Sequence, residues 1–308
     1  MRGDAPLAGS GDPVFPAPET EYAYMENTLF TLNLSCVDRP GIVAGVTTEL
    51  ATIGANIVES NQYRDAPSNR FFMRIAFEGP ARLTRENVEK AIKIVVGRFE
   101  MKAEVRDASI RPKVLIMFSK FDHAMLHLLY QIRVGWLDAE VVAIVSNHED
   151  SRRTAELENI PYHCWRVTKE SKAEQEERLI VLMHETGTEL VVLARYMQVL
   201  SDNLSTRLFG KVINIHHSFL PSFKGAKPYH QAFERGVKLI GATSHCVTPD
   251  LDEGPIIEQE TERVTHAMSA EDFVATGRDI ESRVLARAVK MHIENRVMLN
   301  GHKTVVLN

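Results

Sequence analysis

Cysteine is scarce in this sequence, and the three cysteines are far apart. Cys36, Cys164 and Cys246 are odd in number, and no two of them have the spacing of a zinc-ligand pair. A disulfide framework is therefore not expected, and a reducing compartment suits the chain better. The first residues also lack the apolar stretch of a signal peptide, so we expect a cytoplasmic protein.

Long hydrophobic runs and a strong charge of one sign are lacking too. No apolar run approaches the roughly 20 residues that a membrane-spanning helix needs. The formal net charge is -5, from 36 Lys and Arg against 41 Asp and Glu. Neither nucleic acid nor a membrane is therefore expected as a partner. A chain of 308 residues, 44% of them hydrophobic, suits a globular protein of about two domains.

The sequence pattern divides the chain into a leader and two units. Residues 1–27 are rich in proline and glycine, and we expect a flexible leader there. Residues 28–108 alternate strands and helices in the order βαββαβ, which is the ferredoxin-like split pattern. The first of these strands, Leu29 to Leu34, alternates as a half-buried strand does.

From residue 112 onward, strongly apolar strands alternate with helices. Nearly continuous apolar runs suit a parallel sheet that is covered on both faces. The runs are residues 114–118, 141–145, 190–194 and 212–215. We therefore predict an α/β protein whose second unit, residues 112–308, is a doubly wound, mainly parallel domain. A long helix over residues 270–296 is expected to close it.

Two segments of the second unit carry unusual polar side chains. Asn214 and His216 end a buried strand and, being two residues apart, project to the same side. Residues 248–255 form a turn-rich loop with three carboxylates, one of which is Asp252. Because ligands of doubly wound sheets bind at the carboxyl ends of the strands, these segments predict a polar ligand site there.

Several ordered motifs give the second unit a specific resemblance. They are Asn214-x-His216, Gly241-x-Thr243-x-His245 and Asp252-x-Gly254. Together they resemble the folate-dependent formyltransferase family, over roughly residues 112 to 300. The resemblance implies that Asn214, His216 and Asp252 are the catalytic residues. His217, on the opposite face of the strand, is expected to be structural.

The same resemblance implies two walls of a folate-binding pocket. Backbone groups of these walls would pair with the pterin ring, while apolar side chains supply contact area. The expected wall residues are Arg195, Tyr196, Met197, Gln198, Val199, Leu200, Val247, Thr248, Pro249, Asp250 and Leu251.

The N-terminal unit resembles the ACT family of small regulatory domains. The resemblance rests on the segments 38–43 and 54–57. It implies an amino-acid effector and pairing between copies, so a homo-oligomer is expected. The implied ligand residues are Asp38, Arg39, Pro40, Gly41 and Asn56. A tight turn alone explains residues 38–41 equally well.

An ACT-like unit ahead of a formyltransferase-like domain is similar to the formyltetrahydrofolate deformylase family. That resemblance implies hydrolysis of 10-formyltetrahydrofolate to tetrahydrofolate and formate, which would balance the one-carbon pool for purine synthesis. The segment Ser119 to His123 supports water as the acceptor, because it lacks the glycines of a phosphate cradle and Asp122 would repel phosphate. Neither a metal nor a separate cofactor is expected, since the folate is the substrate.

Some alternatives stay open at this point. One is formyl transfer to an amine acceptor, and another is a non-catalytic folate or amino-acid sensor. For hydrolysis, Asn214 can stabilise the oxyanion and His216 can transfer a proton. Asp252 can orient the water, hold His216 or relay the proton, and the sequence does not select among these roles.

Overall fold

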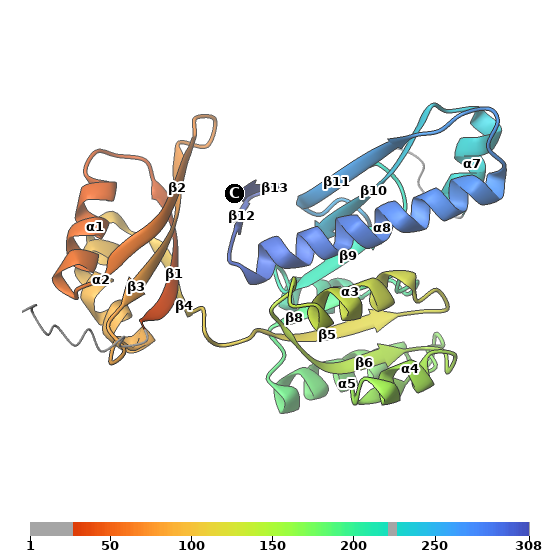
Figure 1. Cartoon of the computed structure of the whole chain (residues 1–308), viewed down its shortest axis with the longest axis horizontal. Coiled ribbons are helices and arrows are strands. Elements are labelled where there is room, and N and C mark those ends of the chain that lie inside the picture. Colours follow the sequence, from red (N-terminus) through yellow and green to blue (C-terminus); the bar gives the residue numbers. More distant parts are fainter. Residues whose placement is uncertain (1–26, 221–226, 308) are drawn as a thin grey trace, which may run out of the picture.

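The computed structural model of the protein describes residues 27–220 and 227–307. All but the last residue of the predicted leader lies outside the described residues. A short linker near residues 108–112 joins an N-terminal unit to a larger C-terminal unit (Figure 1).

The N-terminal unit is a four-stranded antiparallel sheet with two helices on one face. Its elements are β1 (Thr28–Val37), α1 (Ile42–Thr52), β2 (Asn56–Asp65), β3 (Arg70–Gly79), α2 (Arg85–Phe99) and β4 (Lys102–Asp107). The strand order is β2-β3-β1-β4, the arrangement of a ferredoxin-like split βαβ fold. Helix α2 begins after Thr84, whose hydroxyl accepts a hydrogen bond from the Asn87 amide at 3.2 Å.

Strand β1 is buried from Phe30 to Cys36, so the expectation of a half-buried strand was wrong. The strand is central in its sheet, and the helices pack on the face that carries its larger apolar side chains. Its other face is covered by the C-terminal segment, where Asn33 Nδ2 donates to the Asn295 carbonyl at 2.7 Å. Alternation along β1 therefore places larger apolar residues on one face and small polar residues on the other, and both faces are buried.

The C-terminal unit is built on a seven-stranded sheet. Its elements are β5 (Lys113–Phe118), α3 (His123–Arg133), β6 (Glu140–Ser146), α4 (Arg152–Leu157), β7 (Tyr162–Cys164), α5 (Lys172–Thr186), β8 (Leu190–Leu193), α6 (Asp202–Arg207), β9 (Val212–His216), α7 (Pro228–Arg235), β10 (Leu239–Cys246), β11 (Ile256–Arg263) and α8 (Ala270–Ile293). The strand order is β11-β10-β9-β8-β5-β6-β7. Strands β9, β8, β5, β6 and β7 run parallel to one another. The prediction of an α/β fold with a mainly parallel central sheet is confirmed.

The end of the chain differs from the prediction. Helix α8 stops at Ile293, because Asn295 adopts the left-handed conformation with φ of 59° and ends the helical path. A hairpin of β12 (Val297–Asn300) and β13 (Lys303–Val306) follows and lies between the two units (Figure 1). The prediction of a helix up to residue 296 was therefore wrong by one turn.

Charged and polar contacts fasten the two units together. Glu59 in β2 pairs with Arg74 at 2.9 Å and with Arg296 at 2.9 Å. Near the linker, Arg106 of β4 pairs with Glu189 at 3.0 Å. The Glu59–Arg296 and Arg106–Glu189 pairs span the junction and join the N-terminal sheet to the segment after α8 and to the start of β8.

Candidate active site

A cavity of about 220 Å³ opens at the carboxyl ends of β8 and β9 and is bounded opposite by the loop after β10. This is where a doubly wound sheet binds its ligands. The cavity brings together all the predicted catalytic and folate-wall residues: Asn214, His216 and Asp252 with residues 195–200 and 247–251. Its lining also contains His217 and His245, two histidines that were not expected to take part.

The three predicted catalytic side chains form one connected group. His216 Nδ1 lies 3.1 Å from Asp252 Oδ2, and His216 Nε2 lies 3.0 Å from Ser218 Oγ. Asn214 Nδ2 lies 3.2 Å from His245 Nε2. The same ring nitrogen of His245 lies 3.6 Å from Asp252 Oδ1. His245 therefore positions the amide of Asn214 and borders Asp252.

Asp252 is ionised in this setting. Burial by itself would raise the pKa of Asp252, but the adjacent His216 and His245 outweigh burial and hold that pKa well below its usual range. Its side chain is 15% exposed, toward the cavity. Asp252 can therefore hold His216 while a carboxylate oxygen still meets solvent or substrate.

The backbone that presents Asp252 is tightly constrained. Asp252 has φ of 57°, a left-handed conformation that aspartate tolerates better than most residues. Two residues later, Gly254 lies so close to β10 that an added Cβ would be 1.7 Å from the Cys246 carbonyl oxygen. Glycine at this position therefore fixes the distance between the Asp252 loop and the strand that carries His245.

Gly254→Ala should reduce turnover more than it reduces stability. The loop must move away from β10 to admit the methyl group, and Asp252 moves with it. We expect about 100-fold lower kcat and a loss of about 1–3 kcal/mol in free energy of unfolding. Steady-state kinetics and urea unfolding measure the two quantities. Gly97→Ala, within helix α2, is the matched control for a mutated glycine, because no atom lies within 4 Å of its added Cβ and its backbone is helical. Unchanged kcat in Gly254→Ala would contradict the account.

A second group of charges lies behind the cavity and was missed by the sequence analysis. Glu281 of α8 is 1% exposed and receives hydrogen bonds from His123 at 2.9 Å and from the Tyr229 hydroxyl at 2.9 Å. Arg195 Nε lies 3.2 Å from the same carboxylate. Burial would raise the pKa of Glu281, but His123 and Arg195 keep it lowered. Glu281 thus provides the negative charge that balances Arg195, which lines the cavity.

Comparison with known proteins places this site in a family. The formyl transferase family model matches residues 112–289. A formyltetrahydrofolate deformylase from Corynebacterium sp. (strain P-1) is 48% identical over 92% of this chain and 99% of the relative. One from Bacillus subtilis (strain 168) is 47% identical over 90% of this chain and 93% of the relative. This chain belongs to the formyltetrahydrofolate deformylase family.

Comparison with solved structures supports the same family membership. The formyltetrahydrofolate deformylase from Burkholderia mallei has a TM-score of 0.87 at 48% identity, covering 91% of this chain and all of its own. A glycinamide ribonucleotide transformylase from Symbiobacterium toebii has a TM-score of 0.59 at 27% identity, covering 64% of this chain and 95% of its own. The similarity to deformylases thus extends over both units.

The predicted folate wall of this deformylase-family chain exposes apolar side chains at the cavity mouth. Met197 is 54% exposed, Val199 52% and Leu251 60%. Exposed apolar side chains that face each other across a cavity are typical of a binding site for a flat organic ligand. The Met197 amide donates to Ser119 Oγ at 2.9 Å, which anchors this wall to the end of β5.

The described residues contain no metal site, and the predicted effector residues do not line the cavity. Among residues 27–220 and 227–307, no group of three His, Cys, Asp or Glu side chains could hold a metal ion, and no helix is long and apolar enough to cross a membrane. The predicted effector residues 38–41 lie in the turn before α1, where Asp38 pairs with Arg64 at 2.8 Å and Gly41 has φ of 92°, and Asn56 begins β2. That effector site stays a prediction.

His217 makes the stability of the protein depend on pH. Burial and the nearby Arg195 lower the pKa of His217 from 6.5 to about 4. Between those values the unfolded chain binds a proton that the folded chain does not, so stability falls as pH decreases. His217→Gln should lessen this fall, by at most about 3 kcal/mol near pH 4. Urea unfolding near pH 7 and pH 4.5 measures it, with the exposed His266→Gln as control. An equal fall in both variants would refute the assignment.

Proposed function

We propose that this chain hydrolyses 10-formyltetrahydrofolate to tetrahydrofolate and formate, using Asn214, His216 and Asp252. The observation that carries the proposal is the convergence of these three side chains in one cavity with both predicted folate walls. Membership of the deformylase family supports the same reaction. The hydrolysis would release formate and balance the one-carbon pool for purine synthesis.

The proposed reaction is the hydrolysis of an amide. Water attacks the formyl carbon, the carbonyl oxygen becomes an oxyanion, and the bond from that carbon to the folate nitrogen then breaks. Asn214 donates a hydrogen bond to the oxyanion, which is the charge that develops in the transition state. The leaving nitrogen takes up a proton, and the products are tetrahydrofolate and formate.

We assign Asp252 two of the roles that the sequence left open. Its contact with His216 Nδ1 orients the imidazole, and its exposed edge accepts a hydrogen bond from the attacking water. His216 then donates a hydrogen bond or a proton to the intermediate. Because the pKa of Asp252 is depressed, Asp252 itself is a poor proton store. The imidazole of His216 instead takes up the proton that the attacking water loses and gives it to the leaving nitrogen.

Water as the acceptor is supported by the segment between β5 and α3. Asp122 Oδ2 accepts a hydrogen bond from Ser151 Oγ at 2.7 Å, so its carboxylate stays at the start of α3. His123 contacts Glu281 and is not available to a phosphate there. A helix start with a fixed carboxylate and no glycine disfavours a phosphorylated amine as second substrate.

The remaining assignments belong to the same proposal. Residues 28–108 form an ACT-like regulatory domain and residues 112–308 the catalytic domain, and copies of the chain assemble through the former. An amino-acid effector would bind at that domain. The reaction uses no cofactor and no metal, because the folate is the substrate and Asn214, Asp252 and the imidazole supply the polar groups that hydrolysis needs.

Product analysis tests the reaction. Purified protein is given 10-formyltetrahydrofolate without any amine, and formate and tetrahydrofolate are quantified. We expect equal amounts of both products. A parallel reaction contains an added amine, and there too the products should be formate and tetrahydrofolate. A formylated amine in place of formate would replace the hydrolase by a transferase, and tight folate binding without any product would indicate a sensor.

A further inference from the structure

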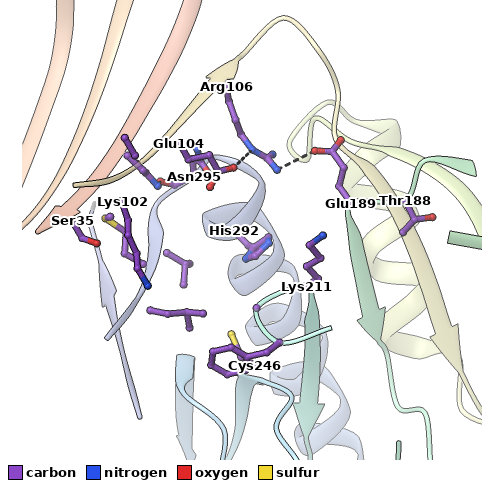
Figure 2. Close-up of a pocket in the computed structure, with 17 residues that line it drawn as sticks. Ser35, Lys102, Glu104, Arg106, Thr188, Glu189, Lys211, Cys246, His292 and Asn295 are labelled. Atoms are coloured by element: carbon purple, nitrogen blue, oxygen red, sulfur yellow. Dashed lines mark hydrogen bonds and ion pairs between the residues drawn. The ribbon is translucent and has the colours of Figure 1, made fainter. Parts of the chain in front are cut away.

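A second cavity, of about 690 Å³, lies between the two units (Figure 2), and its lining contains none of the proposed catalytic residues. The N-terminal sheet contributes Asn33 and Lys102, from β1 and β4. The C-terminal unit contributes Lys211, His292 and Asn295. The reaction proposed above uses none of these side chains, so their chemistry calls for a separate explanation.

Two buried polar atoms in this cavity have no partner. Asn33 is 6% exposed and Asn295 is 8% exposed. Asn33 Nδ2 donates to the Asn295 carbonyl, but among the described residues Asn33 Oδ1 and Asn295 Nδ2 have no hydrogen-bond partner. A buried polar group without a partner destabilises the fold. These two lining residues therefore leave one acceptor and one donor unsatisfied, and a ligand with the complementary pair would satisfy both.

The charged groups around the cavity leave a positive excess. Arg106 pairs with Glu104 at 3.1 Å and with Glu189 at 3.0 Å. Lys102 and Lys211 form no ion pair within the described residues. With two carboxylates against three cationic side chains, the excess is one positive charge, which a ligand with a single negative charge neutralises.

His292 adds a neutral surface to the cavity. Burial, and then the nearby Arg106, lower the pKa of His292 to about 4. Its imidazole is therefore uncharged near neutral pH and offers one donor and one acceptor. An ammonium group on the ligand would place a positive charge near two unpaired lysines. A neutral donor therefore suits this cavity better than an ammonium group.

We propose that this cavity binds a small hydroxycarboxylate. Its carboxylate accepts from Asn295 Nδ2 and faces Lys102 and Lys211, and its hydroxyl donates to Asn33 Oδ1. The ligand touches both units, and Lys211 directly precedes β9, the strand that carries Asn214 and His216. A bound ligand would therefore stabilise the arrangement in which both units contact it, and with it the position of β9. The inference concerns binding alone and does not rest on the proposed reaction.

Three compounds of nearly equal shape test the ligand class. L-lactate carries the hydroxyl, L-alanine has an ammonium group in its place, and propionate has neither. The full chain is titrated calorimetrically with each, without folate. We expect lactate to bind at least about tenfold tighter than the other two. Alanine or propionate binding as tightly as lactate would overturn the class, and no binding of any compound up to about 20 mM would overturn the site.

Substitutions test the location. Asn295→Asp replaces the unpaired donor by oxygen, tolerates φ of 59° and keeps the carbonyl that Asn33 uses. Lys211→Met removes charge at an exposed position, where folding is not at risk. Each should weaken lactate binding at least about tenfold. The exposed Lys90→Met on α2 is the control for lost charge. Unchanged lactate affinity in both cavity variants would overturn the proposal.

Discussion

Asp252→Asn should lower kcat for formate release by about 100- to 10,000-fold, with little change in folate affinity. The amide keeps the shape of the side chain but removes the negative charge that His216 Nδ1 meets at 3.1 Å. It also presents a weaker acceptor to the attacking water. Because the pKa of Asp252 is depressed, the carboxylate is charged throughout the range in which the enzyme would be assayed, and the defect should not be rescued by raising the pH.

A neighbouring carboxylate provides the control for Asp252. Asp250 lines the same cavity and lies on the same loop, but it is exposed and its side chain contacts none of the three proposed catalytic residues. Asp250→Asn should therefore change kcat less than about threefold. Equal losses in the two variants would mean that the net charge of the loop, rather than the contact with His216, supports turnover. Weakened folate binding in Asp252→Asn would likewise count against the proposed role.

Glu281→Gln should destabilise the protein by about 3–5 kcal/mol. Glu281 is almost fully buried beside Arg195, whose Nη1 has no hydrogen-bond partner within the described residues. Removing the negative charge leaves a buried guanidinium without compensation. Thermal or urea unfolding measures the loss. We also expect a higher KM for the folate, because Arg195 lines the cavity as part of the predicted folate wall.

An exposed glutamate on β11 is the matched control for Glu281. Glu262 pairs with Arg283 at 3.1 Å and its side chain is 48% exposed. Since surface ion pairs contribute about 0–1 kcal/mol, Glu262→Gln should have almost no effect on unfolding or on KM. If the two variants lost equal stability, Glu281 would not be the buried counter-charge described above. A loss of stability with unchanged KM would restrict its role to the core.

The parts of the fold that the sequence predicted are those with strong local signals. The continuous apolar runs of β5, β6, β8 and β9 indicated a buried parallel sheet. Strand β7 has three residues, and α7 lies in a polar stretch, so neither has enough periodic positions to be recognised. The hairpin β12–β13 was missed because the helical spacing of α8 was extended past Asn295.

The site was predictable where its residues are consecutive and not where they meet through the fold. Asn214, His216 and the folate walls lie in short segments with a recognisable order. Glu281 and His123 come from two helices far apart in the chain, and each alone resembles an ordinary helical residue. The interdomain pair of Asn33 and Asn295 is likewise invisible before the two units are packed together.

The most direct test of the central claim is the origin of the oxygen in formate. The reaction is run in water labelled with oxygen-18, without an amine, and the formate is analysed by mass spectrometry. Attack by water on the formyl carbon predicts one labelled oxygen in each formate molecule, and formate release at least about 100-fold slower with Asp252→Asn. Unlabelled formate, or labelled formate in equal amounts from the variant, would contradict a water-using site built on Asn214, His216 and Asp252.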